Sequence, residues 1–230
     1  MQDLIIRKTS TILGDEKAKF LRTYFFKEKE VYTEKLNENL DIIETKGTLP
    51  DGLVREYFPS GLTYFECPFK DGKRHGKSKI FFESDKLNVE KFYKNGLLDG
   101  PACVFYPTGR MYEEFYYNND VEDGRRLKYY PSGRIMEVSE YKNGYLEGPC
   151  KTYDEEGNIK TECMYKQNLI VGDKITYHPN GTIAMVSPYQ NGKANGTTKK
   201  YSPSGELQEE WVFEDGQLKA KKDFTLEKEK

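Results

Sequence analysis

The chain has 230 residues, with 36 lysines and arginines against 38 aspartates and glutamates, which leaves a net charge of −2. This balance argues against the basic face that a nucleic-acid-binding protein needs. No run of the sequence approaches the ~20 apolar residues that span a bilayer. Because the residues after Met1 lack the long apolar region of a signal peptide, we expect a cytoplasmic protein unless such a peptide has been removed.

Residues 1–48 show no clean repeat and form the predicted N-terminal cap. A repeat array needs a cap, because an open first strand would template aggregation. Two local structures fit this segment about equally well. One is a helix after Asp15, and the other is a set of degenerate strands. The apolar residues that would form the helical stripe are Leu21, Phe25, Tyr32, Leu36 and Ile43.

Residues 49–219 form the predicted repeat array, in which an aromatic residue recurs every 24 positions. Positions 24 residues apart are called a column below. The first aromatic column holds Phe69, Tyr93, Tyr117, Tyr141, Tyr165, Tyr189 and Phe213. The second holds Tyr57, Phe81, Phe105, Tyr129, Tyr153, Tyr177 and Tyr201. A fixed period of this length is typical of repeat proteins, whose units bury apolar side chains against their neighbours.

Two kinds of turn divide each repeat. Sequences such as Tyr-Pro-Thr-Gly at Gly109 predict a tight turn, because proline presets φ and glycine accepts a positive φ. Sequences such as Lys-Asn-Gly at Gly144 open what we expect to be a longer loop, closed by a second glycine at Gly148. The two runs between the turns have the length of strands, not of helices.

A two-residue turn at Thr108-Gly109 would set the register, placing Glu114 opposite Cys103. When this register is applied to the other repeats, each predicted pair joins a glutamate to a basic residue or joins two apolar residues. Such cross-strand pairs each contribute roughly 0.2–1 kcal/mol. The predicted pairs are Glu66–Arg55, Glu90–Lys79, Glu162–Lys151, Glu210–Lys199, Val138–Leu127 and Val186–Ile175. We interpret the glutamate column as structural, in preference to an acidic ladder that binds a basic partner.

The predicted fold is all-β: an elongated, single-sheet antiparallel meander of about seven 24-residue β-hairpin repeats behind an irregular N-terminal cap. Alternation places the Tyr57 column and the glutamate pairs on one face of the sheet. It places the Phe69 column and an aliphatic row on the other face, the row being Leu87, Met111, Ile135, Ile159, Ile183 and Leu207. Residues 220–230 form a charged tail, which we expect to fray.

The four cysteines are expected to be free thiols. Cys67 and Cys163 share a column four repeats apart, ~40 Å by the strand spacing, which is too far for a disulfide. Cys103 and Cys150 differ by one residue in phase and should project to opposite faces. Reduced cysteines also favour the cytosol.

The sequence offers no catalytic, cofactor-binding or metal-binding set, and we expect no enzyme. His75 and His178 are the only histidines, and neither has ligand spacing to a cysteine or to another histidine. Tyrosine is well suited to a partly exposed binding face. The predicted partner-binding residues lie at the centre of the array and are Tyr106, Tyr112, Tyr116, Tyr129, Tyr130 and Tyr153.

Residues 94–117, KNGLLDGPACVFYPTGRMYEEFYY, resemble the MORN repeat, and more closely its bacterial variant, found in proteins described as YwqK-type antitoxins. The resemblance covers about Leu49 to Leu218. It implies a hairpin array and a non-catalytic, protein-binding scaffold, with a toxin encoded nearby as the partner that it neutralises. The alternative is a scaffold that binds membrane lipid headgroups or is purely structural. A homodimer, face to face, also fits the predicted sheet.

Overall fold

The computed structural model describes residues 5–13 and 18–225. All the regular elements in these ranges are strands, and no helix occurs there. The described residues therefore contain no helix that could cross a membrane. The chain divides into two compact units, which are described separately: unit 1 ends at Arg110, and unit 2 begins at Met111. The predicted all-β class is confirmed.

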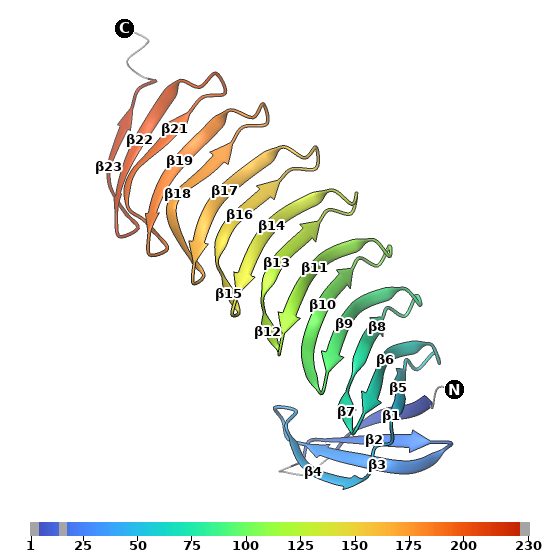
Figure 1. The fold of residues 1–230 in the computed structure, drawn as a ribbon. Helices are drawn as coiled ribbons and strands as arrows, with labels where there is room; N and C mark the ends of the chain where they lie inside the picture. The colour runs from blue at the N-terminus through green and yellow to red at the C-terminus, as the bar shows by residue number, and fades with distance from the viewer. Residues whose placement is uncertain (1–4, 14–17, 226–230) are drawn as a thin grey trace. The chain divides into compact units, whose positions relative to one another are not determined.

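The cap in unit 1 consists of strands. They are β1 (Ile5–Ile12), β2 (Phe20–Phe26), β3 (Lys29–Leu36) and β4 (Ile42–Gly47). They pair antiparallel in chain order, and Figure 1 shows them in blue. Of the two alternatives for this segment the helix is wrong, although Asp15 itself lies outside the described residues. Lys27 and Glu28 take positive φ and let the chain reverse between β2 and β3.

The cap also covers the first strand of the array. β1 runs parallel to β5 (Gly52–Tyr57), with Ile6 opposite Val54. The small core beside this junction contains Tyr24, Leu49 and Val54, packed against Val31, Tyr32 and Phe69. The hydroxyl of the buried Tyr24 donates a hydrogen bond to Glu34 at 3.1 Å. Because β1 occupies the edge of β5, the expectation that the cap covers the array's first edge is confirmed.

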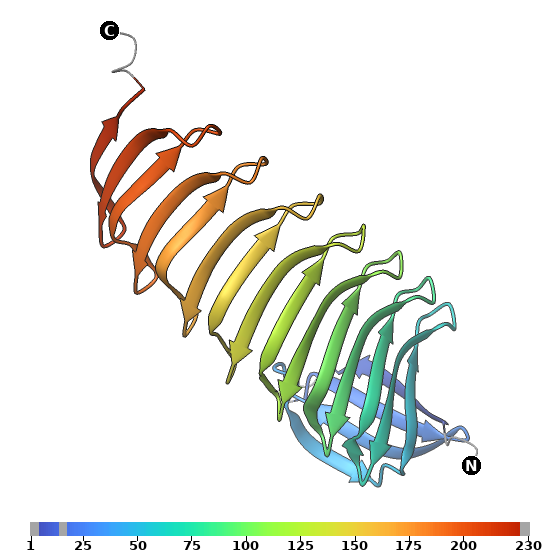
Figure 2. The same cartoon turned by 45° about the horizontal axis from the view of Figure 1, so that its top comes forward.

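The rest of unit 1 is a meander of antiparallel strands, shown from a second side in Figure 2. Its strands are β6 (Thr63–Lys70), β7 (Lys73–Arg74), β8 (Gly76–Phe81), β9 (Leu87–Lys94) and β10 (Leu97–Phe105).

Unit 2 continues the same pattern of hairpins. Its longer strands are β11 (Met111–Asn118), β13 (Gly124–Tyr129), β14 (Ile135–Lys142), β16 (Gly148–Tyr153), β17 (Ile159–Lys166), β18 (Leu169–Tyr177), β19 (Ile183–Gln190), β21 (Gly196–Tyr201), β22 (Leu207–Glu214) and β23 (Gln217–Asp223). Its two-residue strands are β12 (Val121–Glu122), β15 (Tyr145–Leu146) and β20 (Lys193–Ala194).

The predicted register is confirmed in every hairpin described within one unit. Glu66 lies opposite Arg55, and Glu162 lies opposite Lys151. The two apolar exceptions also pair as predicted, Val138 with Leu127 and Val186 with Ile175. The remaining confirmed pairs are Glu90–Lys79 and Glu210–Lys199.

The two kinds of turn were assigned the wrong way round. At the proline turn, Tyr106 N–H donates to Arg110 O and Gly109 N–H donates to Tyr106 O, both at 2.8 Å, which closes a three-residue loop. The tight two-residue turn is the one at Asn143-Gly144, where both residues take positive φ and Lys142 pairs with Tyr145. Both kinds of turn are visible at opposite edges of each unit (Figures 1 and 2).

A β-bulge next to each proline turn explains why the register was still correct. The three-residue loop shifts the pairing by one residue, and the bulge shifts it back: Lys128 pairs with Glu137, but Tyr129 pairs with Ile135. Paired residues share a face. The aliphatic row that contains Ile135 therefore lies beside the Tyr57 column, and its predicted placement with the Phe69 column is wrong.

The predicted tail begins inside a strand. β23 pairs with β22 through Asp223, which lies opposite Glu209. The expectation that the chain frays from Ala220 is therefore wrong for residues 220–223, because their backbone groups complete the ladder. Residues 226–230 lie outside the described residues.

Candidate functional site

Two faces of the sheet carry different side chains, and the names below are kept from here on. Face 1 is the side that carries the Tyr57 column, the glutamate column of Glu66 and the aliphatic row. Face 2 is the side that carries the Phe69 column. The Cys67 column lies on face 2, and most of the side chains in it are buried beneath their neighbours.

Four of the six predicted partner-binding tyrosines lie on face 1 of unit 2. Tyr112 and Tyr116 come from β11, Tyr129 from β13 and Tyr153 from β16. The β11–β13 pairing places Glu114 opposite Leu127. Tyr116 is the most accessible of the set, with an exposed fraction of 50%.

The other two tyrosines lie in proline loops. The Tyr130 hydroxyl donates a hydrogen bond to the carbonyl of Tyr153, one repeat further on, at 2.7 Å. Tyr130 thus joins two repeats. Tyr106 belongs to unit 1, so the structure does not place it with the five tyrosines of unit 2.

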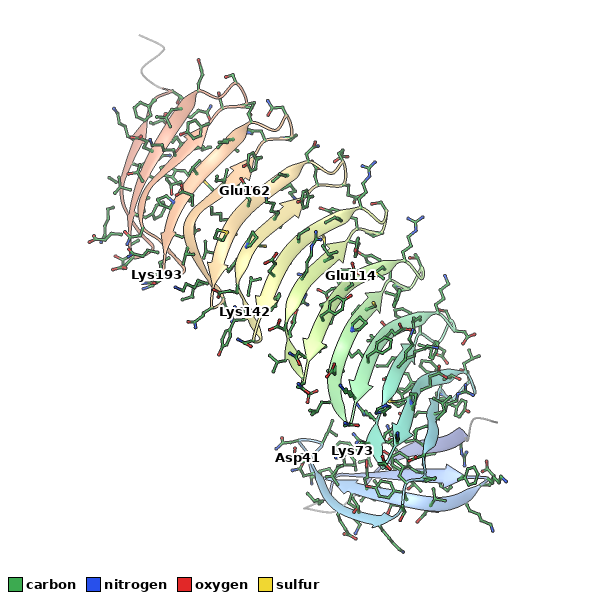
Figure 3. The ribbon with its side chains drawn as sticks, in the orientation of Figure 1. Asp41, Lys73, Glu114, Lys142, Glu162 and Lys193 are labelled. Carbon is green, nitrogen blue, oxygen red and sulfur yellow. The ribbon has the colours of Figure 1, made fainter. Side chains whose placement is uncertain are left out.

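Two tyrosines of the Tyr57 column are held by glutamates of the preceding repeat. The Tyr129 hydroxyl donates to Glu114 at 2.6 Å, and the Tyr177 hydroxyl donates to Glu162. Glu114 and Glu162 are labelled in Figure 3. The bond to Glu162 raises the pKa of Tyr177 to about 12. Held by these bonds, the two rings have less conformational freedom than free side chains.

Most carboxylates of the glutamate column are also paired with cations. Glu66 contacts both Arg55 and Lys79 at 3.2 Å, and Lys151 contacts Glu162 at 3.1 Å. These contacts support the structural interpretation of the column. Glu90 differs in detail, because its ion-pair partner is Lys77 at 2.8 Å.

The aliphatic row adds accessible apolar surface to the same face. Ile135 has an exposed fraction of 37%, and Ile183 one of 40%. Each lies opposite a tyrosine, Tyr129 and Tyr177 respectively. Face 1 of unit 2 therefore presents aromatic and aliphatic side chains beside glutamates, a composition suited to protein contact.

Face 2 of unit 2 contains a charged cluster that the sequence analysis missed. Arg126 donates to Glu113 at 2.7 Å and to Glu122 at 3.2 Å, and its guanidinium lies over the rings of Phe115 and Tyr141. Burial raises the pKa of Glu122 despite the nearby arginine. The two carboxylates share the single guanidinium of Arg126, so each charge in the cluster lies beside an opposite one.

A hollow near the C-terminal end of face 2 surrounds the chain's tryptophan. Its volume is ≈ 470 Å³, and Trp211, Phe213, Tyr189 and Met185 supply its apolar wall. The hydroxyl of Thr198, also in the lining, is buried without a hydrogen-bond partner. The hollow is wide enough to accept one apolar side chain.

The edge with the Asn-Gly turns carries accessible apolar side chains between lysines. Lys142 and Lys193 mark this edge of unit 2 in Figure 3. Tyr145 has an exposed fraction of 50%, and Val121 and Leu169, in the same column, are similarly accessible. Acidic residues of the edge are used as caps: Asp123 accepts the N–H of Asn143, and Glu147 accepts that of Gln167.

Both histidines join successive repeats. His75 Nδ1 accepts the N–H of Asn95 at 3.5 Å, and His178 Nε2 lies 2.9 Å from the carbonyl of Tyr201. Within the ranges that the structure describes, no three His, Cys, Asp or Glu side chains gather as metal ligands.

One pair of functional groups was missed although its column positions were known. Cys150 on β16 lies directly opposite Cys163 on β17. All four cysteines are free thiols. Cys150 and Cys163 belong to different columns, and the register that pairs Lys151 with Glu162 also pairs these two cysteines.

Comparison with known families explains the repeat. The family model described as MORN repeat variant matches six tandem segments: residues 74–95, 98–119, 122–143, 146–167, 170–191 and 194–215. A comparison with curated proteins found no match. Repeats of this kind indicate a scaffold for binding. Because the six segments cover more than half of the sequence, the chain belongs to the MORN repeat variant family.

Proposed function

We propose that this chain is a non-catalytic scaffold that binds a protein partner through face 1 of unit 2. The observation that carries the proposal is the half-exposed Tyr116 on the same face as Tyr112, Tyr129 and Tyr153. Aromatic side chains supply much of the binding energy of protein interfaces. The bond between Tyr129 and Glu114 supports the proposal further, because a ring already held in place has less freedom to lose.

Affinity purification of the tagged chain from its native host tests the proposal. Proteins retained through a salt wash are identified by mass spectrometry. We expect one stoichiometric partner. Tyr116→Ala together with Tyr112→Ala should lower its capture about tenfold or more, the effect of losing a central aromatic anchor. If no protein stays bound to the tagged chain through the wash, the proposal of a dedicated protein partner is contradicted.

Tyr145→Ala is the matched control for Tyr116→Ala. Both tyrosines have an exposed fraction of 50%, but Tyr145 lies opposite Lys142 at the Asn-Gly turn edge, whereas the tyrosines of the proposed site lie in β11, β13 and β16. Capture should be unchanged by Tyr145→Ala. An equal loss with both variants would show that the partner does not distinguish face 1 from the turn edge, and the proposed site would be wrong.

The finer proposal is that the partner is a toxin and that the chain neutralises it. Its support is the resemblance of residues 94–117 to the variant repeat of YwqK-type antitoxins. Co-expression with the captured partner tests it: the partner alone should stop growth, and the chain should restore it. Normal growth with the partner alone would leave a scaffold with some other protein target.

Binding of membrane lipid headgroups is the second candidate. The observation in its favour is the hollow of ≈ 300 Å³ at the Asn-Gly turn edge, lined by Lys142, Lys166 and Tyr145 among others. Glu147 also lines it but is engaged with the N–H of Gln167. Flotation with anionic vesicles, lost in high salt, would support lipid binding, and the absence of salt-sensitive flotation would exclude it.

A further inference from the structure

Two cysteines of unit 2 face each other across a pair of antiparallel strands. Cys150 is the third residue of β16, and its Cα partner on β17 is Cys163. Residues on both sides keep the same register, since Pro149 pairs with Met164 and Lys151 with Glu162. Each thiol also influences the pKa of the other. Their side chains therefore meet on face 2.

The backbone geometry of this pair suits a disulfide. Directly opposed residues of antiparallel strands have Cα atoms ~4.5 or ~5.5 Å apart, depending on the type of pair. Disulfides span Cα separations of ~4.4–6.8 Å. Both values for opposed residues fall within that range, so the bond can form without separating the strands.

The surroundings of the two thiols keep them protonated at neutral pH. Burial raises the pKa of Cys150 to about 12, and the charge of Glu137 adds to the effect. Burial also raises the pKa of Cys163, against the opposing influence of Lys174. Two further titratable groups face the pair: Lys128 and Tyr165. The positions of the two cysteines therefore allow a disulfide. We expect its formation to be slow, because little of either thiol is present as the reactive thiolate.

We propose that Cys150 and Cys163 form a dithiol that a low-molecular-weight disulfide, such as oxidised glutathione, converts to an intramolecular cross-strand disulfide. This modification site is independent of the proposed partner-binding face, because it lies on face 2. The bond would tie β16 to β17 covalently at the centre of a hairpin.

The reaction is a two-step thiol–disulfide exchange. Cys150, the more accessible thiol, loses its proton to water, and its thiolate attacks one sulfur of oxidised glutathione. This step releases one glutathione thiolate, which takes up a proton, and leaves a mixed disulfide on Cys150. Cys163 then loses its proton to water, its thiolate attacks the Cys150 sulfur, and the second glutathione leaves as a thiolate that takes up a proton. The two cysteines lose two electrons, and the glutathione disulfide gains them.

Peptide mapping of the intact chain tests this proposal. The reduced, folded chain is incubated with oxidised glutathione, alkylated, and digested with trypsin without reduction. We expect residues 143–151 and 161–166 to be recovered as one linked species from chains of monomeric mass. Cys67 and Cys103 should be recovered alkylated. Recovery of Cys150 and Cys163 in alkylated form, or linked only between two chains, would overturn the proposal.

Two variants make the assignment specific. Cys67→Ser is the matched control, because Cys67 occupies the same column as Cys163 but lies opposite Val54. It should leave the linked peptides unchanged. Cys163→Ser should stop the reaction at glutathione on Cys150. If the mixed disulfide on Cys150 also persists in the chain that retains Cys163, then Cys163 cannot reach Cys150.

The pH dependence of the rate gives a second readout. Below the thiol pKa, the thiolate fraction rises about tenfold for each unit of pH, and the oxidation rate should rise with it. A rate that is high at neutral pH and insensitive to alkali would contradict the protected state of the two thiols.

Discussion

The hydroxyl of Tyr177 donates a hydrogen bond to Glu162, and this bond ties neighbouring repeats together on face 1. It raises the pKa of Tyr177 to about 12 and, together with Lys151, lowers the pKa of Glu162. For the tyrosine, the stabilisation is full below the unfolded pKa of about 10 and is lost as pH rises toward 12. For the glutamate, it is present above the unfolded pKa and is lost as pH falls.

We expect Tyr177→Phe to lower the free energy of unfolding by about 1 kcal/mol at neutral pH. It should also reduce the loss of stability between pH 10 and 12, which urea titrations at several pH values would measure. Tyr153→Phe is the control, because the glutamate column holds Val138 in the repeat before Tyr153. Equal effects of the two variants would show that the bond to Glu162 contributes nothing.

Gln167 occupies the first position of a two-residue turn with φ of 49°, where most other repeats have Asn or Asp. A left-handed backbone is less costly for asparagine than for glutamine. Gln167→Asn should therefore stabilise the chain by up to about 1 kcal/mol, seen as a higher midpoint of thermal unfolding. Asn143→Gln makes the reverse change one repeat earlier and should destabilise by a similar amount. A destabilising Gln167→Asn would contradict this account.

At the scale of single elements, Gly47 at the end of β4 shows how closely the cap strands approach. Its φ is +88°, and an added Cβ would lie 2.2 Å from the carbonyl oxygen of Val31. Gly61, in a proline loop, has φ of +87° and nothing within 4 Å of the same atom. The two glycines differ in the steric clash and not in the backbone conformation.

We expect Gly61→Ala to lower the free energy of unfolding by about 1–2 kcal/mol, the cost of a left-handed alanine. Gly47→Ala should cost at least about 2 kcal/mol more, because β3 and β4 must move apart. Denaturant unfolding of the two variants measures the difference. Equal losses would show that the cap relaxes around the new methyl group.

The repeat and its pairings could be predicted from the sequence because each hairpin restates them. The charge pairs were enough to predict the register of the two strands in each hairpin. The loop at Gly109 was nevertheless predicted one residue too short. The β-bulge beside Ile135 compensates for the longer loop, but no sequence pattern predicts it. The residue at the bulge position differs from repeat to repeat. The aliphatic row was therefore placed on the wrong face.

The Cys150–Cys163 pair could have been predicted, because the register that pairs Lys151 with Glu162 also pairs these cysteines. The cluster around Arg126 could not. It depends on Glu122 from a two-residue strand, and the position of that strand follows from the tight Asn119-Asp120 turn. The strands of the cap were equally hidden, because residues 1–48 have no internal copy against which a pattern can be tested.

At the scale of the whole molecule, the balance of charge bears on how a partner would be held. The net charge is −2, and many carboxylates on both faces are paired with lysine or arginine. Such a surface exerts little long-range attraction, and salt screens what remains.

We therefore expect capture of the protein partner to change less than tenfold when the salt concentration is raised severalfold, as measured by titration of the purified complex. An anionic lipid surface would behave differently, since its attraction to lysines falls steeply with salt. A steep decline would move the binding site from face 1 to the lysine-bearing turn edge.

The hydrogen bonds that join a carboxylate of one turn to the N–H of the next turn span a constant number of residues. Asp51 accepts the N–H of Asp71, Asp123 that of Asn143, and Glu147 that of Gln167, each 20 positions ahead. A bond of this kind depends only on two successive turns, wherever they lie in the array. Asp123 and Asn143 lie within one repeat, so duplicating residues 123–146 would place the same acceptor and donor 20 positions apart in the copy. Each added hairpin would lengthen the array by ~10 Å and still carry the bond that holds its turn.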